Sequence, residues 1–189
     1  MISQITYAYA KSDPKTRFCQ GDIVHDVSLI SHTGYKDGSA EITEIILKYG
    51  VIISQDCDLE HDFNNRNNVE APNQDKYLPN ILLLPAYLKE DFKKGAHLSP
   101  TLNCASWGSD LFKKIQQNND SRFHSLKGSS GHQIPDLIVD FKHLYTINRN
   151  VIYEVMTDVY LATIGEVFRE NLSHRYSHYL SRIGLPEIN

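Results

Sequence analysis

Residues 18–30 read Phe-Cys-Gln-Gly-Asp-Ile-Val-His-Asp-Val-Ser-Leu-Ile. A Gly-Asp pair, which is typical of turns, precedes side chains that alternate with a period of two. Ile23, Val27 and Leu29 fall on one face of this alternation, and Asp26 and Ser28 fall on the other. A period of two is the pattern of a β-strand, so this stretch predicts a strand that begins a sheet.

The segments that follow predict further strands joined by loops. Gly and Asp residues in 31–39 indicate a connecting loop, and the β-branched residues of 42–54 favour two strands, or one strand bent at Gly50. Residues 55–80 are rich in Asn and Pro, which predicts a long surface loop, most mobile at 62–76. The apolar run 81–85 predicts a short buried strand.

The second half of the chain mixes the two element types. Helical spacing appears in 87–94 and 109–117, strand alternation appears in 122–126, and 135–147 with 151–155 favours a hairpin. The C-terminal part has a capping-box spacing from Thr163 to Glu166 and an apolar stripe at helical intervals. Its members are Ile164, Phe168, Leu172, Tyr176, Leu180 and Ile183. We therefore predict a long helix over 163–183.

Together these elements predict an α+β fold. We expect a bent antiparallel β-barrel of about six strands, with short inserted helices and the C-terminal helix packed on one end. The strands lie in 18–86 and 122–156 and the helical insertion in 87–119. A chain of 189 residues is long enough to bury one core, so we expect a single domain.

Composition limits the function classes. The net charge of −4 argues against broad, sequence-independent nucleic-acid binding, which depends on many cations. Three cysteines without a C-x-x-C pair indicate neither a disulfide framework nor a zinc finger. No apolar run approaches the roughly 20 residues that span a bilayer, and the N-terminus lacks a basic segment leading into an apolar one. We expect a cytoplasmic protein that does not contact a membrane.

The densest polar group follows the apolar residues 51–53. It contains Gln55, Asp58 and, at ligand-compatible spacing, Cys57 and His61. Thiolate, carboxylate and imidazole are all zinc ligands, so Cys57, Asp58 and His61 form an alternative zinc or thiol site, although no second half-site accompanies them. The favoured interpretation has no cofactor: Cys57 packs at the strand end and Asp58 caps the turn.

Basic side chains suggest other contact residues. Arg122 and His124 lie on one predicted strand, an arrangement that fits a strand in contact with RNA. Arg175, His178 and Arg182 lie in the second half of the predicted helix, where cations could bind phosphate or an acidic partner, or stabilise the negative end of the helix dipole. Asp140 and His143 are three residues apart on a predicted strand, which places them on opposite faces as separate surface residues.

The first half resembles the PemK and MazF family of small bacterial toxin barrels. The matching motifs are Gly-Asp-Ile-Val at 21–24, Val-Ile-Ile-Ser at 51–54 and the apolar run 81–85 after an Asn-containing loop, so the resemblance covers roughly 18–86. It implies a half-open, Src-homology-like barrel that binds RNA. The family's catalytic Arg and Thr or Ser are not matched, because Lys48-Tyr49-Gly50 and Pro85-Ala86-Tyr87 stand in their places.

These observations predict a binding module rather than a nucleotide-dependent enzyme, since no phosphate-binding glycine motif occurs. We expect a degenerate toxin-like barrel that recognises RNA or a partner protein in a stress-response or phage-defence system, with a homodimer as one arrangement that would bury the helix stripe. Gln55 and Asp58 join the basic residues as candidate binding residues. The alternative is an enzyme, either a divergent ribonuclease or one centred on Cys57, Asp58 and His61.

Overall fold

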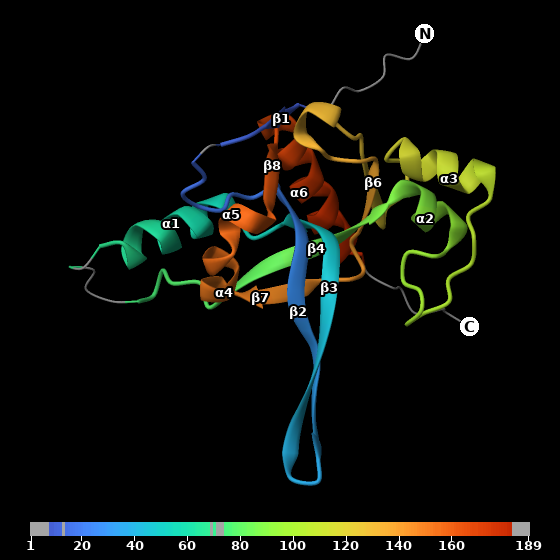
Figure 1. Ribbon diagram of the computed structural model, residues 1–189. Coiled ribbons are helices and arrows are strands. Elements are labelled where there is room, and N and C mark those ends of the chain that lie inside the picture. The colour runs from blue at the N-terminus through green and yellow to red at the C-terminus, as the bar shows by residue number, and fades with distance from the viewer. Residues whose placement is uncertain (1–7, 13, 69, 71–73, 183–189) are drawn as a thin grey trace, which may run out of the picture.

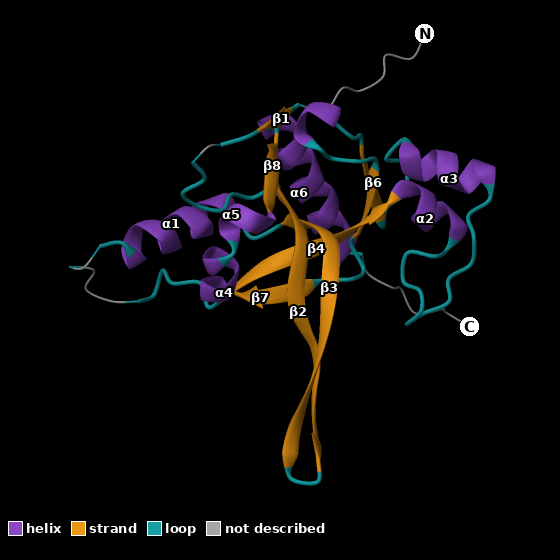
Figure 2. Ribbon diagram, viewed as in Figure 1, coloured by secondary structure: helices purple, strands orange, loops and turns teal. Residues whose placement is uncertain are grey.

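The computed structural model describes residues 8–12, 14–68, 70 and 74–182. Its elements in chain order are β1 (Tyr9–Ala10), β2 (Asp22–Lys36), β3 (Ser39–Ile52), α1 (Asp56–Arg66), β4 (Asn80–Leu88), α2 (Lys89–Lys94), α3 (Ser109–Gln116), β5 (Phe123–Leu126), the 3-10 turn η1 (Ser130–His132), β6 (Leu137–Asp140), β7 (Tyr145–Asn148), α4 (Arg149–Glu154), α5 (Met156–Val159), β8 (Tyr160–Ile164) and α6 (Glu166–Leu180). The fold is therefore mixed α+β, with an antiparallel half-barrel sheet and several helices (Figures 1 and 2).

The sheet is built around the long strands β2, β3 and β4. Its order is β1-β8-β2-β3-β4-β6-β5, and β7 also pairs with β4. β4 pairs with β7 along its first half and with β6 along its last residues, while 83–85 pair with β3 on its other edge. This sharing of one strand among three partners bends the sheet into the half-barrel.

Both faces of the sheet are covered. Ile23, Val51 and Leu84 face α6 and pack with its Leu172. Their neighbours in the chain point to the other face, where Leu59 of α1 and residues of α4 and α5 complete a second core. A strand that is buried on both faces needs apolar side chains at successive positions. This explains the unbroken runs 51–53 and 81–84.

A glycine sets the start of β2. Gly21 has φ of +82°, in the left-handed region that side chains other than glycine rarely adopt. Its N–H donates to the Ile52 carbonyl and its carbonyl accepts from the Ile164 N–H, so it connects β2 to both neighbouring strands. A Cβ there would lie 2.9 Å from Cγ of Arg169 in α6. The Gly-Asp turn predicted from the sequence therefore lies where β3, β8 and α6 approach the start of β2 closely.

Several local predictions are wrong. The expected loop at 31–39 is strand on both sides of a turn at Asp37 and Gly38, so β2 and β3 form one long hairpin. The expected loop at 55–80 contains α1. The expected strand at 151–155 falls in α4, and β6 and β7 each pair with β4 and not with a partner at 151–155. Figure 2 shows these helices in purple.

Tertiary contacts explain the helix α1. Its sequence is poor in strong helix formers, and most helical stability in proteins comes from packing of this kind. Leu59 is buried in the core, and the buried carboxylate of Asp62 accepts hydrogen bonds from Arg66 Nε and Arg149 Nε, each at 2.7 Å. The Leu78 N–H also donates to Asp62 at 2.7 Å. Residue 62 belongs to the segment expected to be mobile, but it is buried and hydrogen-bonded. Residues 69 and 71–73 of that segment lie outside the described residues.

The C-terminal helix is shorter than predicted. Thr163 and Ile164 belong to β8, and α6 begins after Gly165 with no side-chain cap, so the expected capping box is absent. Leu172 is buried and Phe168 and Tyr176 are partly buried against the sheet, whereas Leu180 is exposed. Ile183 lies outside the described residues. The stripe therefore contacts the sheet through its middle and not along its full length.

Candidate functional site

A pocket of about 530 Å³ lies where the end of β3, the start of α1, the start of β4 and the face of α6 meet. Its apolar lining consists of Ile53, Leu78, Leu82 and Leu180. Its polar lining consists of Gln20, Ser54, Gln55, Asp58, Asn80, Ser173, Tyr176 and Ser177. Two of the candidate binding residues from the sequence, Gln55 and Asp58, therefore contribute to one concave surface.

Backbone hydrogen bonds fix the floor of the pocket. The Ser54 hydroxyl accepts from the Leu82 N–H at 2.9 Å, and the Gln20 side-chain amide donates to the Ile53 carbonyl at 3.1 Å. The Leu59 N–H donates to the Gln55 carbonyl, which closes the first turn of α1. These bonds hold the junction between β3 and α1 against β4, so the exposed side chains of Gln55 and Asp58 start from a fixed backbone.

The two carboxylates at this junction, Asp56 and Asp58, have different surroundings. Asp56 is turned away from the pocket, accepting from Arg17 Nη1 at 3.1 Å and from the Gln20 N–H at 3.2 Å. Burial alone would raise the pKa of Asp56, but these hydrogen bonds and the charge of Arg17 outweigh it and lower that pKa. Among the residues that line the pocket, Asp58 is the one ionisable carboxylate, and neither Lys nor Arg is present.

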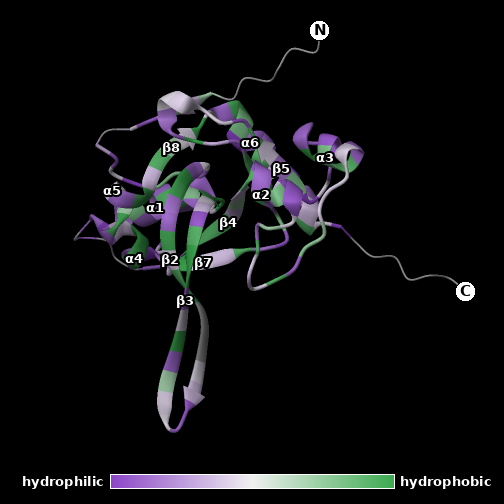
Figure 3. Ribbon diagram, turned by 45° about the vertical axis from the view of Figure 1, so that its right-hand side comes forward, coloured by the Kyte–Doolittle hydropathy of each residue, from purple (hydrophilic) through white to green (hydrophobic). Residues whose placement is uncertain are grey.

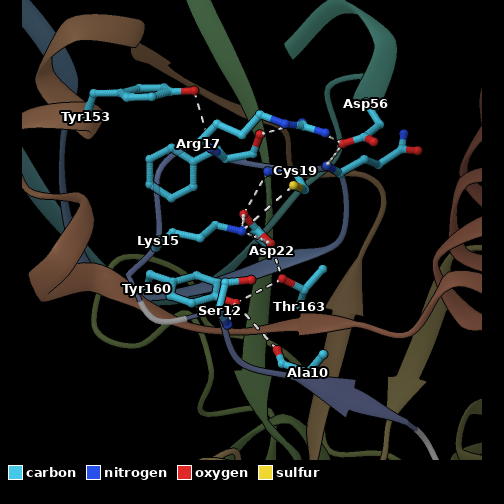
Figure 4. A network of polar contacts seen from close by, with 12 residues as sticks. Ala10, Ser12, Lys15, Arg17, Cys19, Asp22, Asp56, Tyr153, Tyr160 and Thr163 are labelled. Carbon is cyan, nitrogen blue, oxygen red and sulfur yellow. Dashed lines mark hydrogen bonds and ion pairs between the residues drawn. The ribbon is translucent and has the colours of Figure 1, made fainter. Parts of the chain in front are cut away.

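A buried ionic network lies near this junction, at the start of β2 (Figure 4). Asp22 is fully buried, and Lys15 Nζ lies 2.8 Å from its Oδ2 with a side chain only 5% exposed. The Thr163 hydroxyl donates to Asp22 at 2.6 Å and the Cys19 N–H donates at 2.7 Å. Burial raises the pKa of Asp22, while Lys15 and these donors oppose the rise. The network ties the segment before β2 to β8.

The candidate cations from the sequence do not converge on the pocket. Arg122 binds the fully buried Asp140 through two hydrogen bonds of 2.8 and 2.6 Å. His124 is 1% exposed and belongs to the core side of β5, so it is not a surface contact residue. His178 and Arg182 are exposed on and after α6, and Arg182 donates to the Ser121 hydroxyl at 3.1 Å. None of these side chains lines the pocket.

Asp140 and His143 are close together, contrary to the expectation of separate surface residues. The chain turns after β6, which brings His143 Nδ1 to 3.4 Å from Asp140 Oδ2. Tyr87 Oη lies 3.5 Å from the same nitrogen. The strand rule that placed them on opposite faces fails because β6 ends at Asp140.

Arg175 has a structural role. Its Nη1 donates to the Asn118 carbonyl, and its Nη2 donates to the carbonyls of Asp120 and Phe123 at 2.6 and 2.8 Å. It thus caps the turn between α3 and β5 from the side of α6. The expectation that Arg175 is a freely available contact residue is wrong for this reason.

Arg175→Ala should therefore lower the free energy of unfolding by about 2–3 kcal/mol, since hydrogen bonds from a charged donor contribute about 1.5–3 kcal/mol and carbonyls would lose their partners. Urea unfolding followed by circular dichroism measures this loss. The matched control is His178→Ala, an exposed change on the same helix, which should stay within about 0.5 kcal/mol of the wild type. Equal stability of the two variants would contradict the assignment.

Among the described residues, the fold does not bring a set of zinc ligands together around Cys57 and His61. Cys57 and His61 are exposed on α1, and Cys57 contacts Gln55 and Asp58 only through weak sulfur interactions. Within the described ranges, no three His, Cys, Asp or Glu side chains are grouped as metal ligands would be. The expectation that Cys57 packs at the end of the strand as a small apolar residue is wrong, because Cys57 lies in α1 and its side chain is exposed.

Most of the residues that line the pocket were not among the candidate residues predicted from the sequence. Gln20, Asn80, Ser173, Tyr176 and Ser177 come from segments whose polar residues carried no motif. In α6, the alternation of Ser173 and Ser177 with Tyr176 was a usable signal, because positions three and four apart lie on one helix face. A polar helix face beside an apolar stripe can line a pocket as well as face solvent.

Comparisons with known proteins add no family. A scan against protein-family models, a search of curated proteins and a search of solved structures each found no match to this chain. Among the described residues, no helix is both long and apolar enough to cross a bilayer.

Proposed function

We propose that the protein is a binding module that recognises a partner protein, and that its pocket takes up a basic side chain of that partner. The observation that supports this proposal is the lining of the pocket. Its one ionisable carboxylate is Asp58, its other polar groups are amides and hydroxyls, and its walls include the apolar Leu82 and Leu180. Binding sites are concave and combine apolar walls with polar groups that orient the ligand.

The chemistry of the lining favours a cation over an anion. A Lys or Arg side chain buries its aliphatic stem on apolar surface and places its charged end among acceptors. Leu82 and Tyr176 offer such a surface, and Asp58, Gln55 and Asn80 offer acceptors. An RNA phosphate would meet a carboxylate and no lysine or arginine there, and Arg122 and Arg175 are already engaged. RNA is therefore the less favoured of the two expected ligands.

The pocket proposal is tested by following backbone amide signals in NMR titrations with blocked arginine amide, blocked glutamine amide and a short single-stranded RNA. The arginine amide should shift the signals of 54–58 and 173–177 most strongly. Asp58→Asn should weaken its binding about three- to tenfold, since a partly exposed ion pair contributes roughly 1 kcal/mol.

The matched control is Glu60→Gln, which removes the same charge from the same helix at an exposed position outside the pocket. It should leave arginine-amide binding within about twofold. Tighter binding of the RNA at the same amides would replace the protein partner by RNA. Equal loss in Asp58→Asn and Glu60→Gln would mean that general charge, and not the pocket, attracts the probe.

The proposal also covers the type of barrel and the biological system in which the protein acts. We place the half-barrel among half-open, Src-homology-like barrels of the PemK and MazF kind, in a cytoplasmic stress-response or phage-defence system. The Gly-Asp-Ile-Val start of β2 and its pairing with β3 support this placement. The enzyme alternative, either a divergent ribonuclease or a metal- or thiol-dependent activity centred on Cys57, Asp58 and His61, stays a prediction.

A further inference from the structure

The β2–β3 hairpin extends far beyond the body of the protein (Figure 1). We call its outer part, residues 30–46, the arm. Among the described strands, β8 pairs with β2 only at 22–24 and β4 pairs with β3 only at 50–52, so beyond those residues each of the two strands pairs only with the other. Every residue from Tyr35 to Glu44 is exposed. A two-stranded ribbon of this kind is marginally stable in water by itself.

The large apolar side chains of the arm that are exposed share one side of the ribbon. They are Ile30, Tyr35, Ile42 and Ile46, with exposed fractions of 66%, 83%, 59% and 72%. Ile42 and Ile46 are even-numbered positions of β3 and so point the same way, together with Ala40 and Glu44. Tyr35 pairs with Ala40 and Ile30 pairs with Glu44, and directly paired residues lie on the same side.

Beyond Ile45, which packs against the core of the body, the opposite side of the arm is polar. Thr43 and Glu41 occupy it on β3, and Gly34 pairs with Glu41. Figure 3 shows polar and apolar residues following one another along the hairpin. The bulge between Ile30 and His32 preserves this segregation, because without the extra residue Tyr35 would fall on the opposite side. Segregation of this kind is what a surface that contacts another molecule requires.

The charges of the arm indicate whether its apolar side binds a second copy of this chain or a different protein. The arm carries Asp37, Glu41 and Glu44 against one Lys36. Glu44 lies on the apolar side, beside Ile42 and Ile46 and next to the centre of the patch, where it accepts from the Ser28 hydroxyl at 3.2 Å. A two-fold contact between two such patches would place Glu44 near its own copy inside an apolar interface, and like charges there are unfavourable.

We propose that the apolar side of the arm is a second contact surface, and that it binds a partner protein presenting an apolar patch with a lysine or arginine opposite Glu44. This inference rests on the proposed function only in that the partner is a protein. It uses different residues from the pocket, so the two can fail separately.

The test selects short random peptides from a display library against the full-length wild-type protein and measures their binding by fluorescence anisotropy. Peptides that contain apolar residues and Lys or Arg should be enriched. Ile42→Ser should weaken their binding about tenfold or more, as expected for a central apolar contact. Glu44→Lys should have an effect of the same size, and Asp58→Asn should leave binding unchanged.

Glu41→Lys is the matched control, because it makes the same charge change on the opposite side of the ribbon. It should keep binding within about threefold. All three arm variants alter exposed residues, and melts by circular dichroism check that the body remains folded. Equal losses in Glu44→Lys and Glu41→Lys, or unchanged binding in Ile42→Ser, would overturn the proposal. A wild-type dimer by sedimentation that Ile42→Ser converts to monomer would overturn the choice of partner in favour of a second copy.

Discussion

Asp22→Ala is expected to lower the free energy of unfolding by about 3–5 kcal/mol, the largest effect of any single substitution that we predict. Asp22 is fully buried, and the side chain of its partner Lys15 is 5% exposed. Removing the carboxylate leaves a buried ammonium without a counter-charge, and the Thr163 hydroxyl and Cys19 N–H lose their acceptor. A typical domain has a stability of about 5–15 kcal/mol, so this loss is a large share of the total.

Urea unfolding at neutral pH measures this loss, and the double variant Lys15→Met/Asp22→Leu separates its causes. Replacing a buried ion pair by apolar residues is often neutral or stabilising, so the double variant should be more stable than Asp22→Ala. If the single variant proves insoluble, Asp22→Asn, which keeps the size of the side chain, gives the measurable value. An Asp22→Ala protein within about 1 kcal/mol of the wild type would show that the ionic network does not stabilise the fold.

The second large effect concerns pH. Burial in the core, with a smaller contribution from the charge of Arg175, lowers the pKa of His124 to about 3. In the unfolded chain a histidine has a pKa of about 6.5. Below pH 6.5 the unfolded state therefore binds a proton that the folded state does not, so stability falls as the pH falls. Between pH 7 and pH 5 this difference amounts to about 2 kcal/mol.

The measurement compares urea unfolding at pH 7 and pH 5 for the wild type and for His124→Gln, which cannot titrate. The variant is expected to be less stable at pH 7, because it changes a buried side chain, but its stability should fall less on acidification by about 2 kcal/mol. His178→Gln changes an exposed histidine and serves as the control, with a pH dependence like that of the wild type. The same pH dependence in wild type and His124→Gln would contradict the buried, neutral histidine.

The two predictions concern residues for which the sequence carries little information. The Gly-Asp pair at 21–22 reads as a turn, and nothing local indicates that its carboxylate is buried with a lysine seven residues earlier. His124 follows Arg122 with the spacing of a contact strand, yet α6 packs on β5 and places Arg175 near His124. Burial depends on which element packs on top, and this information is not contained in an alternating pattern.

Local signals with a local cause were sufficient for several elements. The period of two after Asp22 specified the start of β2, the apolar run 81–85 specified the centre of β4, and the amphipathic spacing of 109–117 specified α3. Gln55 and Asp58 belong to the densest polar group of the sequence, directly after the apolar residues 51–53, and both line the pocket. Each of these features depends on residues that are close together in the sequence.

The tertiary structure alone decided the rest. Residues 56–66 became a helix because Leu59 and Asp62 find buried partners on distant segments, although the Asn-rich sequence favours a loop. The pocket exists because α6 crosses the sheet and brings 173–180 to the junction of β3 and α1. Sequence periodicity records the face that each element buries, but the partner of that face is set by contacts between residues far apart in the chain, and these contacts form only when the whole core packs.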